Sequence, residues 1–201
     1  NADMNDRIDD ADAAYVQGIV EGKNEATKLS DANYDGKIDS SDVDSINGII
    51  KGEEKELTVC DSINRNVTVK MPVTAIIALG SYRNEAAKIL KAQEMMVGVS
   101  SDILENGYYY PDLADKPAVG TWSAPDSEAI VTLHPDLVIT SANLERANKL
   151  EESLKPAGIP VLGLEFYRDN ILRSEIRTLG FILNKNKEAD SYLQWRAKYD
   201  Q

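Results

Sequence analysis

Two kinds of hydrophobic pattern run through residues 57–165. Residues 57–62 and 67–71 alternate between apolar and polar positions around a turn-like IleAsnArgAsn, which predicts a β-hairpin. Buried parallel strands are predicted by four continuous apolar runs, at residues 75–80, 96–100, 137–140 and 160–165. Helical spacing of apolar residues occurs between and after these runs, at residues 81–93, 125–133, 143–158, 170–184 and 187–200. Alternating strands and helices predict an α/β lobe with a largely parallel sheet.

The N-terminal segment lacks this pattern and repeats itself with a period of thirty residues. Ile8, Asp9 and Asp12 recur as Ile38, Asp39 and Asp42. Each copy reads as a polar loop followed by a helix, so we expect a small module at residues 1–52. A short polar joint at 53–56 separates it from the lobe at 57–201, and the predicted fold class is α plus α/β.

The second copy of the repeat, DANYDGKIDSSD, has the spacing of an oxygen-ligand calcium loop. Gly36 permits the sharp turn at position 6, and alternate residues of such a loop point inward. The predicted Ca²⁺ ligands are the side chains of Asp31, Asn33, Asp35, Asp39 and Asp42 and the backbone carbonyl of Lys37. The alternative is an acidic turn before a helix whose N-terminus favours Asp.

The first copy is the weaker match to that loop. Its equivalent ligands are Asn1, Asp3, Asn5, Arg7 through its carbonyl, Asp9 and Asp12. Asn1 replaces Asp, and Asp6 replaces the glycine of position 6, so we expect the second site to bind Ca²⁺ more tightly. Residues 1–56 hold 15 acidic and 6 basic side chains, an excess that favours cation ligands over a solvating tail.

A loop-then-helix repeat with Asp at position 12 resembles the dockerin family over residues 1–52. The resemblance implies a Ca²⁺-dependent module that attaches to cohesin domains. The partner-reading positions fall on Ser40 and Ser41 in the second copy, and on Asp10 and Ala11 in the first. Because the two copies differ there, symmetric binding is not expected. The alternative is a Ca²⁺-stabilised spacer that packs on its own neighbour.

The amino-acid composition argues against several classes of function. The chain has 201 residues, with 34 acidic and 22 basic side chains, and its net charge of −12 argues against nucleic-acid binding. A single Cys excludes an intramolecular disulfide, and no apolar run approaches the length of a membrane span. No nucleotide-binding glycine motif is present, and the single His134 precedes Pro135 in a surface connector. The chain is therefore predicted not to be an enzyme.

Ligands of parallel sheets bind beyond the carboxyl ends of the strands, so residues that follow each strand are candidate contacts. They are Ser81, Tyr82, Arg83, Ser101, Tyr108, Tyr109, Tyr110, Trp122, Ser141, Asn143 and Tyr167. This aromatic and polar rim suits a large planar or chelated ligand with acidic groups. Each residue alone could instead anchor its loop.

The lobe, with its HPDLVI and AGIPV motifs, resembles the N-terminal lobe of class III substrate-binding proteins of ABC importers. The resemblance implies an iron-siderophore, haem or corrinoid ligand contacted by Trp122, and a permease-docking role for Glu128. It also implies a location outside the cytoplasm at the cell surface, and a long C-terminal helix leading to a second lobe. With half a cleft exposed, a dimer is expected. The alternative function is a cell-surface adapter acting through a dockerin–cohesin-type contact.

Overall fold

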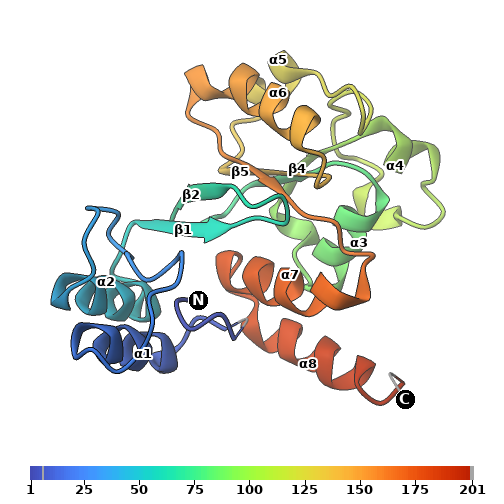
Figure 1. Ribbon diagram of the computed structural model, residues 1–201. Helices are drawn as coiled ribbons and strands as arrows, with labels where there is room; N and C mark the ends of the chain where they lie inside the picture. The colour runs from blue at the N-terminus through green and yellow to red at the C-terminus, as the bar shows by residue number, and fades with distance from the viewer. Residues whose placement is uncertain (6, 200–201) are drawn as a thin grey trace.

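The computed structural model describes residues 1–5 and 7–199, and it divides into a two-helix module and an α/β lobe (Figure 1). The module consists of α1 (Asp10–Val20) and α2 (Ser40–Lys51), each preceded by a polar loop. The two helices pack against each other around Ala13, Val16 and Ile46. Ile8 and Ile49 of the module instead pack against the core of the lobe, so the two parts are in direct contact.

The thirty-residue repeat is reproduced in the hydrogen bonds that start both helices. Asp9 caps α1 and Asp39 caps α2. In each case the side chain of the Asp three residues later accepts a hydrogen bond from the backbone N–H of the capping residue. The carboxylates of Asp12 and Asp42 are buried, at 1% and 0% exposure, because both serve this capping box. The repeated Asp-x-x-Asp spacing therefore fixes both helix starts.

The lobe contains an antiparallel hairpin and a separate four-stranded parallel sheet. The hairpin pairs β1 (Glu56–Cys60) with β2 (Asn66–Lys70). The parallel sheet has the order β4-β3-β5-β6, with all neighbours parallel. Its strands are β3 (Ile76–Ala78), β4 (Met96–Val99), β5 (Leu137–Thr140) and β6 (Val161–Gly163). Every predicted strand is confirmed.

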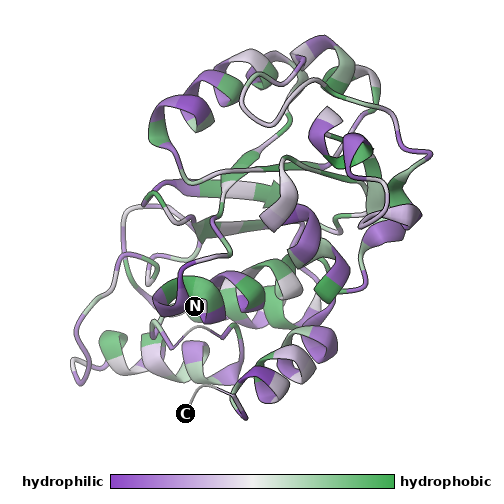
Figure 2. Cartoon of the chain, turned by 90° about the vertical axis from the view of Figure 1, so that its right-hand side faces the viewer, coloured by the Kyte–Doolittle hydropathy of each residue, from purple (hydrophilic) through white to green (hydrophobic). Residues whose placement is uncertain are grey.

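Helices cover both faces of the parallel sheet. The helices of the lobe are α3 (Ser81–Ile89), α4 (Ser101–Glu105), α5 (Ser127–Thr132), α6 (Leu144–Leu154), α7 (Asp169–Ile182) and α8 (Asn186–Arg196). Ile76 and Ile139 pack in one cluster with α3, α7, α8 and the hairpin, whereas Ile77 and Val138 pack with α5 and α6. Figure 2 shows these apolar segments in the sheet and on the helix faces turned toward it. The strands are apolar on both faces because both are covered.

The C-terminal part forms two helices, as the spacing at residues 170–184 and 187–200 predicts, in place of the one long helix that the family resemblance implies. In the described residues α7 and α8 are separate helices that pack against each other. Asn184 has a positive φ of 54°, and the Lys185 N–H donates to the Gly180 carbonyl. This left-handed turn ends α7 and reverses the chain. The predicted helix at 143–158 likewise ends at Leu154 and finishes in a 3₁₀ turn, Lys155–Ala157, that contains Pro156.

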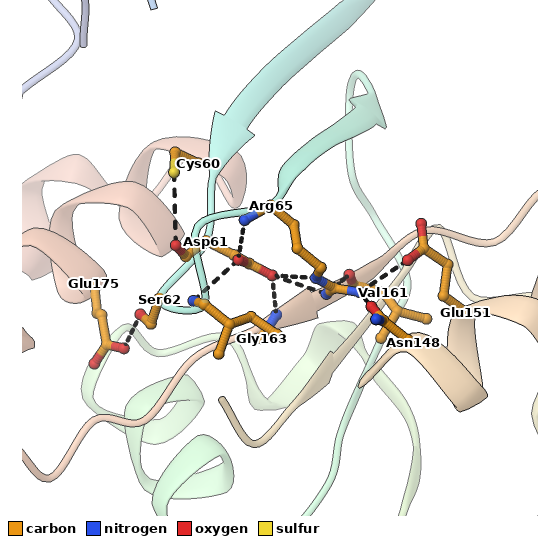
Figure 3. Close-up of polar contacts among 10 residues, drawn as sticks. Cys60, Asp61, Ser62, Arg65, Asn148, Glu151, Val161, Gly163 and Glu175 are labelled. Carbon is orange, nitrogen blue, oxygen red and sulfur yellow. Dashed lines mark hydrogen bonds and ion pairs between the residues drawn. The ribbon is translucent and has the colours of Figure 1, made fainter. Parts of the chain in front are cut away.

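A buried ion pair fastens the hairpin turn to the edge of the parallel sheet (Figure 3). Asp61 accepts from Arg65 Nη2 at 2.8 Å and from the Gly163 backbone of β6 at 3.2 Å. Arg65 also donates to the Val161 carbonyl and to Glu151 on α6. The hairpin turn is therefore joined to the sheet edge by these side chains and by a backbone hydrogen bond from the Ser62 N–H to the Gly163 carbonyl.

Candidate functional site

An open hollow of about 540 Å³ lies at the carboxyl ends of the parallel strands. It receives residues from the segments that follow all four parallel strands and from the loop before α5. Of the residues predicted from the sequence, the hollow is lined by Ser81, Tyr82, Arg83, Trp122, Ser141, Asn143 and Tyr167. The sheet topology thus brings together segments that are far apart in the chain.

The remaining predicted contacts lie outside the lining of this hollow. Tyr108 and Tyr109 are 91% and 67% exposed, and their rings pack edge to face on each other. Tyr110 is buried and donates to Glu85, and burial beside that carboxylate raises the pKa of Tyr110 to about 12. Ser101 starts α4, where its backbone N–H donates to the Gly120 carbonyl. These residues shape the segment beside the hollow.

Aromatic rings and arginines alternate across the hollow. The Arg146 guanidinium lies 4.8 Å from the centroid of the Trp122 ring. Tyr82 and Tyr167 form a ring pair at 5.2 Å, and Arg168 lies 5.7 Å from the Tyr167 centroid. Such surfaces offer stacking faces and cationic hydrogen-bond donors to the same ligand.

Arg83 is the buried cation of the site, with an exposed fraction of 5%. Its Nε donates to the Leu79 carbonyl at 2.7 Å, which aims the guanidinium along the sheet edge. Burial lowers the pKa of Arg83, while the nearby carboxylates of Glu165 and Asp102 raise it. Because these effects on its pKa oppose each other, the Arg83 side chain remains charged.

Two oxygen atoms at the hollow have no hydrogen-bond partner among the described residues. They are the Asp102 Oδ1 and Ser141 Oγ atoms, and both are shielded from solvent. Buried polar atoms are nearly always satisfied in folded proteins. A ligand with both donor and acceptor groups would satisfy this pair.

Arg146 and Glu165 line the hollow and were not predicted from the sequence. Arg146 lies in the first turn of α6, after the Asn143 cap that accepts its backbone N–H at 3.0 Å. Glu165 lies two residues after the end of β6 and is 7% exposed. The available signal was the position of both residues shortly after a strand end.

The second polar loop curls around its own carboxylates. Asp31 accepts from the backbone N–H of Asp35 and Gly36, at 3.1 and 2.9 Å. Asp42 accepts from the Asn33 N–H at 3.2 Å. Asp39 and Asp35 accept from backbone N–H groups of the residues two positions later. These hydrogen bonds stabilise the turns of the second loop, in which Asn33 and Asp35 remain exposed. The assignment of its side chains as Ca²⁺ ligands stays a prediction.

The first loop repeats part of this arrangement. Asp12 accepts from the Asp3 N–H at 3.1 Å, and Asn5 accepts from the Arg7 N–H at 2.8 Å. Met4 and Tyr34, which occupy the same place in the two loops, both have a φ of 60°. Within residues 1–5 and 7–199, no three or more Asp, Glu, His or Cys side chains are arranged to hold a metal ion. The two predicted sets of Ca²⁺ ligands also include Asn side chains and backbone carbonyl oxygens.

The predicted partner-facing residues are exposed. Glu128 lies in the first turn of α5, next to the Asp126 cap. Ser40 and Ser41 lie in the first turn of α2, where the Ser41 hydroxyl donates to Asp39 and accepts from Asn33. No helix in the described part of the chain is both long and apolar enough to cross a membrane.

Comparison with known proteins agrees with this fold. The chain is similar to a periplasmic solute binding protein from Veillonella parvula, at 20% identity and a TM-score of 0.60, over 71% of this chain and 45% of that one. It is also similar to the molybdate-binding protein MolA of Haemophilus influenzae, at 19% identity and a TM-score of 0.59, over 67% of this chain and 48% of that one. A third similar structure is the petrobactin-binding protein YclQ of Bacillus subtilis, at 19% identity and a TM-score of 0.59, over 70% of this chain and 50% of that one.

The present chain spans about half the length of these structures. A search of curated proteins gives no match. The sequence pattern of the Periplasmic binding protein family matches residues 76–196, which covers most of the α/β lobe. This match confirms the resemblance of the lobe stated above, and the chain belongs to the Periplasmic binding protein family.

Proposed function

We propose that the lobe is the ligand-capture half of an extracytoplasmic substrate-binding protein for an ABC importer. The observation that carries this proposal is the hollow at the strand ends, where Arg146 lies over Trp122 and Arg168 lies beside Tyr167. Capture and release require shape and charge complementarity and no bond chemistry, so the protein is proposed not to be an enzyme.

The proposed ligand is a metal chelate, a haem or a corrinoid. The hollow presents Arg83, Arg146 and Arg168 against two carboxylates, Asp102 and Glu165, so it carries a net positive charge. The aromatic rings provide flat contact surfaces for a planar or chelated ligand. Related structures are described as binding molybdate and petrobactin, which supports an anionic ligand.

A titration tests this proposal. The chain, and the longer natural protein where further sequence follows, is titrated with hemin, cyanocobalamin and a ferric catecholate siderophore, and binding is measured by equilibrium dialysis. We expect saturable binding of one of the three and loss of that binding in Trp122→Ala. Arg173→Ala, an exposed position on α7 outside the hollow, is the matched control. No binding of any probe by the longer protein would contradict the importer function.

Hand-over to the permease is proposed to use Glu128. Its carboxylate is exposed on α5, where it can meet an arginine of the transporter. Glu128→Lys should abolish transport in vesicles that contain the permease while leaving ligand binding unchanged. Glu145→Lys, an exposed acid in the first turn of α6, serves as the control.

The N-terminal module is proposed to bind Ca²⁺ and to act as a dockerin-like attachment or spacer. The clustered oxygens of Asp31, Asn33 and Asp35, which accept hydrogen bonds from neighbouring N–H groups, support this proposal. Calcium would neutralise carboxylates whose present partners are N–H groups of the same loop. Asp31→Ala with Asp35→Ala should remove Ca²⁺-dependent protection of residues 31–52, and Asp44→Ala on α2 should not. Equal melting profiles with and without Ca²⁺ would refute the metal assignment.

The second candidate function is a cell-surface adapter, favoured by the exposed Ser40 and Ser41. Pull-down with a recombinant cohesin domain tests it, with Ser40→Arg and Ser41→Arg expected to prevent capture. Association of two copies through the open hollow is a related proposal. Light scattering of the chain tests that dimer, and Trp122→Ala should disrupt it.

A further inference from the structure

Glu175 on α7 holds the chain segment that enters the hollow. Its Oε1 accepts from the Glu165 N–H and its Oε2 from the Phe166 N–H, both at 2.7 Å. Phe166 has a positive φ of 63°, a conformation that these two bonds keep in place. The next two residues, Tyr167 and Arg168, line the hollow. The position of Glu175 therefore sets the path of the ligand-facing segment.

The N-terminal module forms one wall of a cavity that borders this carboxylate. Met4, Ile8 and Lys28 of the module share a cavity of about 350 Å³ with Glu175. The exposed fraction of Glu175 is only 2% in this arrangement. Hydrogen bonds to a carboxylate are stronger where water is excluded. The module thus contributes to the surroundings that strengthen the two backbone bonds.

Contacts with α7 and α8 on one side and with the hairpin on the other fix the module in this position (Figure 1). Arg7 donates to Asp190 on α8 at 3.3 Å, and Asp190 lies 3.9 Å from Arg177 on α7. Lys28 Nζ donates to Cys60 Sγ at 2.9 Å and to the side chain of Asn64 at 3.3 Å.

The turn that Lys28 contacts also reaches Glu175. It carries Ser62, whose hydroxyl donates to the Glu175 carboxylate (Figure 3). Hydrogen bonds therefore connect Lys28 of the module, through the turn that carries Asn64 and Ser62, to Glu175 and the segment at the hollow.

We propose that the N-terminal module is a buttress for the ligand site. Arg7 and Ile8 dock the first loop on α7 and α8, and the docked loop closes one wall of the cavity beside Glu175, which limits the access of water to its carboxylate. Glu175 is then a positioning residue that orders Tyr167 and Arg168. The proposal deepens the proposed function, since it rests on the hollow being the ligand site. It assigns the module a role inside its own chain, in addition to any external attachment.

Amide exchange measured by NMR on the ligand-free chain tests this proposal. In Arg7→Ala with Ile8→Ala, we expect the Glu165 and Phe166 amides to exchange about fivefold to tenfold faster, the loss of roughly one net hydrogen bond. Glu175→Gln should accelerate the same two amides and leave residues 1–52 unchanged. Lys37→Ala, the same loop position in the second copy, should have no effect at either amide, because Lys37 is exposed.

Unchanged Glu165 and Phe166 rates in the double variant overturn the buttress, whether or not the module stays docked. If that variant does not fold, Asp190→Asn replaces it, with an expected acceleration of about twofold to fivefold, and unchanged rates there overturn the proposal equally. Because no ligand is added, a failure to bind hemin, cyanocobalamin or siderophore would contradict the proposed function and leave the exchange result standing.

Discussion

The guanidinium of Arg146 lies over the indole of Trp122, 4.8 Å from the ring centroid. Trp122 comes from the loop before α5 and Arg146 from the first turn of α6, so the contact joins two segments at the mouth of the hollow. Trp122 remains 39% exposed, which leaves part of its ring available to a ligand. A cation that is already held over a ring can meet an anionic group without further ordering.

Removing this cation should weaken ligand binding without unfolding the lobe. For Arg146→Ala we expect the affinity for the bound probe to fall by about threefold to thirtyfold, the range of a cation–π contact plus a charged donor. In a Trp195→Phe background Trp122 is the only tryptophan, and its emission should change on the Arg146→Ala substitution. An unaltered Trp122 spectrum together with unaltered affinity would show that the contact has no role.

The buried ion pair of the hairpin turn should be critical for stability. Asp61 is fully buried as a side chain, and Arg65 is 14% exposed. Asp61→Ala leaves the guanidinium without its buried partner, and we expect a loss of about 3–5 kcal/mol in the free energy of unfolding. Glu151 contacts the same arginine from the surface, at 47% exposure, so Glu151→Ala should cost less than about 1 kcal/mol. Urea denaturation of the two variants measures the difference, and equal losses would contradict it.

Gly120 occupies a position that no side chain fits. Its φ is +81°, and an added Cβ would meet the Ala124 carbonyl oxygen at 2.7 Å and the Asp126 nitrogen at 2.8 Å. Both contacts are with backbone, so Gly120→Ala should destabilise the lobe by more than about 2 kcal/mol. Gly158 has a φ of +69° with open space around it, so Gly158→Ala should cost only about 1 kcal/mol. Thermal unfolding compares the two, and a smaller loss for Gly120→Ala would refute the clash.

Asp136 should make the stability of the lobe sensitive to acid. Its burial favours the neutral form, but the bonds from the Thr74 and Ala75 N–H groups and the Thr74 hydroxyl lower the pKa of Asp136 below its usual 3.8. A carboxyl group whose pKa is lower in the folded state stabilises the fold above its unfolded pKa. That contribution should be lost as the pH falls from about 3.8 through the folded value.

Asp136→Asn isolates this contribution. The variant should lose about 1–3 kcal/mol at pH 6 and differ much less from the wild type at pH 2.5. Urea denaturation at both pH values makes the comparison. A constant difference between the two proteins across this range would contradict the assignment.

Much of the local structure could be predicted from the sequence. The runs around Ile77 and Val138 specify buried strands because their apolar character is continuous and short. The Asp9 and Asp39 caps follow from a local motif that the repeat displays twice. The two C-terminal helices also follow from apolar spacing, whereas the one long helix came only from the family resemblance. It is not found in the described residues, where Asn184 takes a left-handed conformation between α7 and α8.

The sequence by itself determined the order of strands and helices, the repeated loops and the family resemblance of the lobe, because these depend on residues close together in the chain. Only the tertiary structure decided which side chains meet. It brought Arg146 and Glu165 into the hollow and left Tyr108 and Tyr109 outside it. It also placed the first loop against α7 and α8, with Arg7 paired to Asp190. The physical reason is that sheet order and helix packing set distances between residues far apart in the chain, which no local pattern encodes.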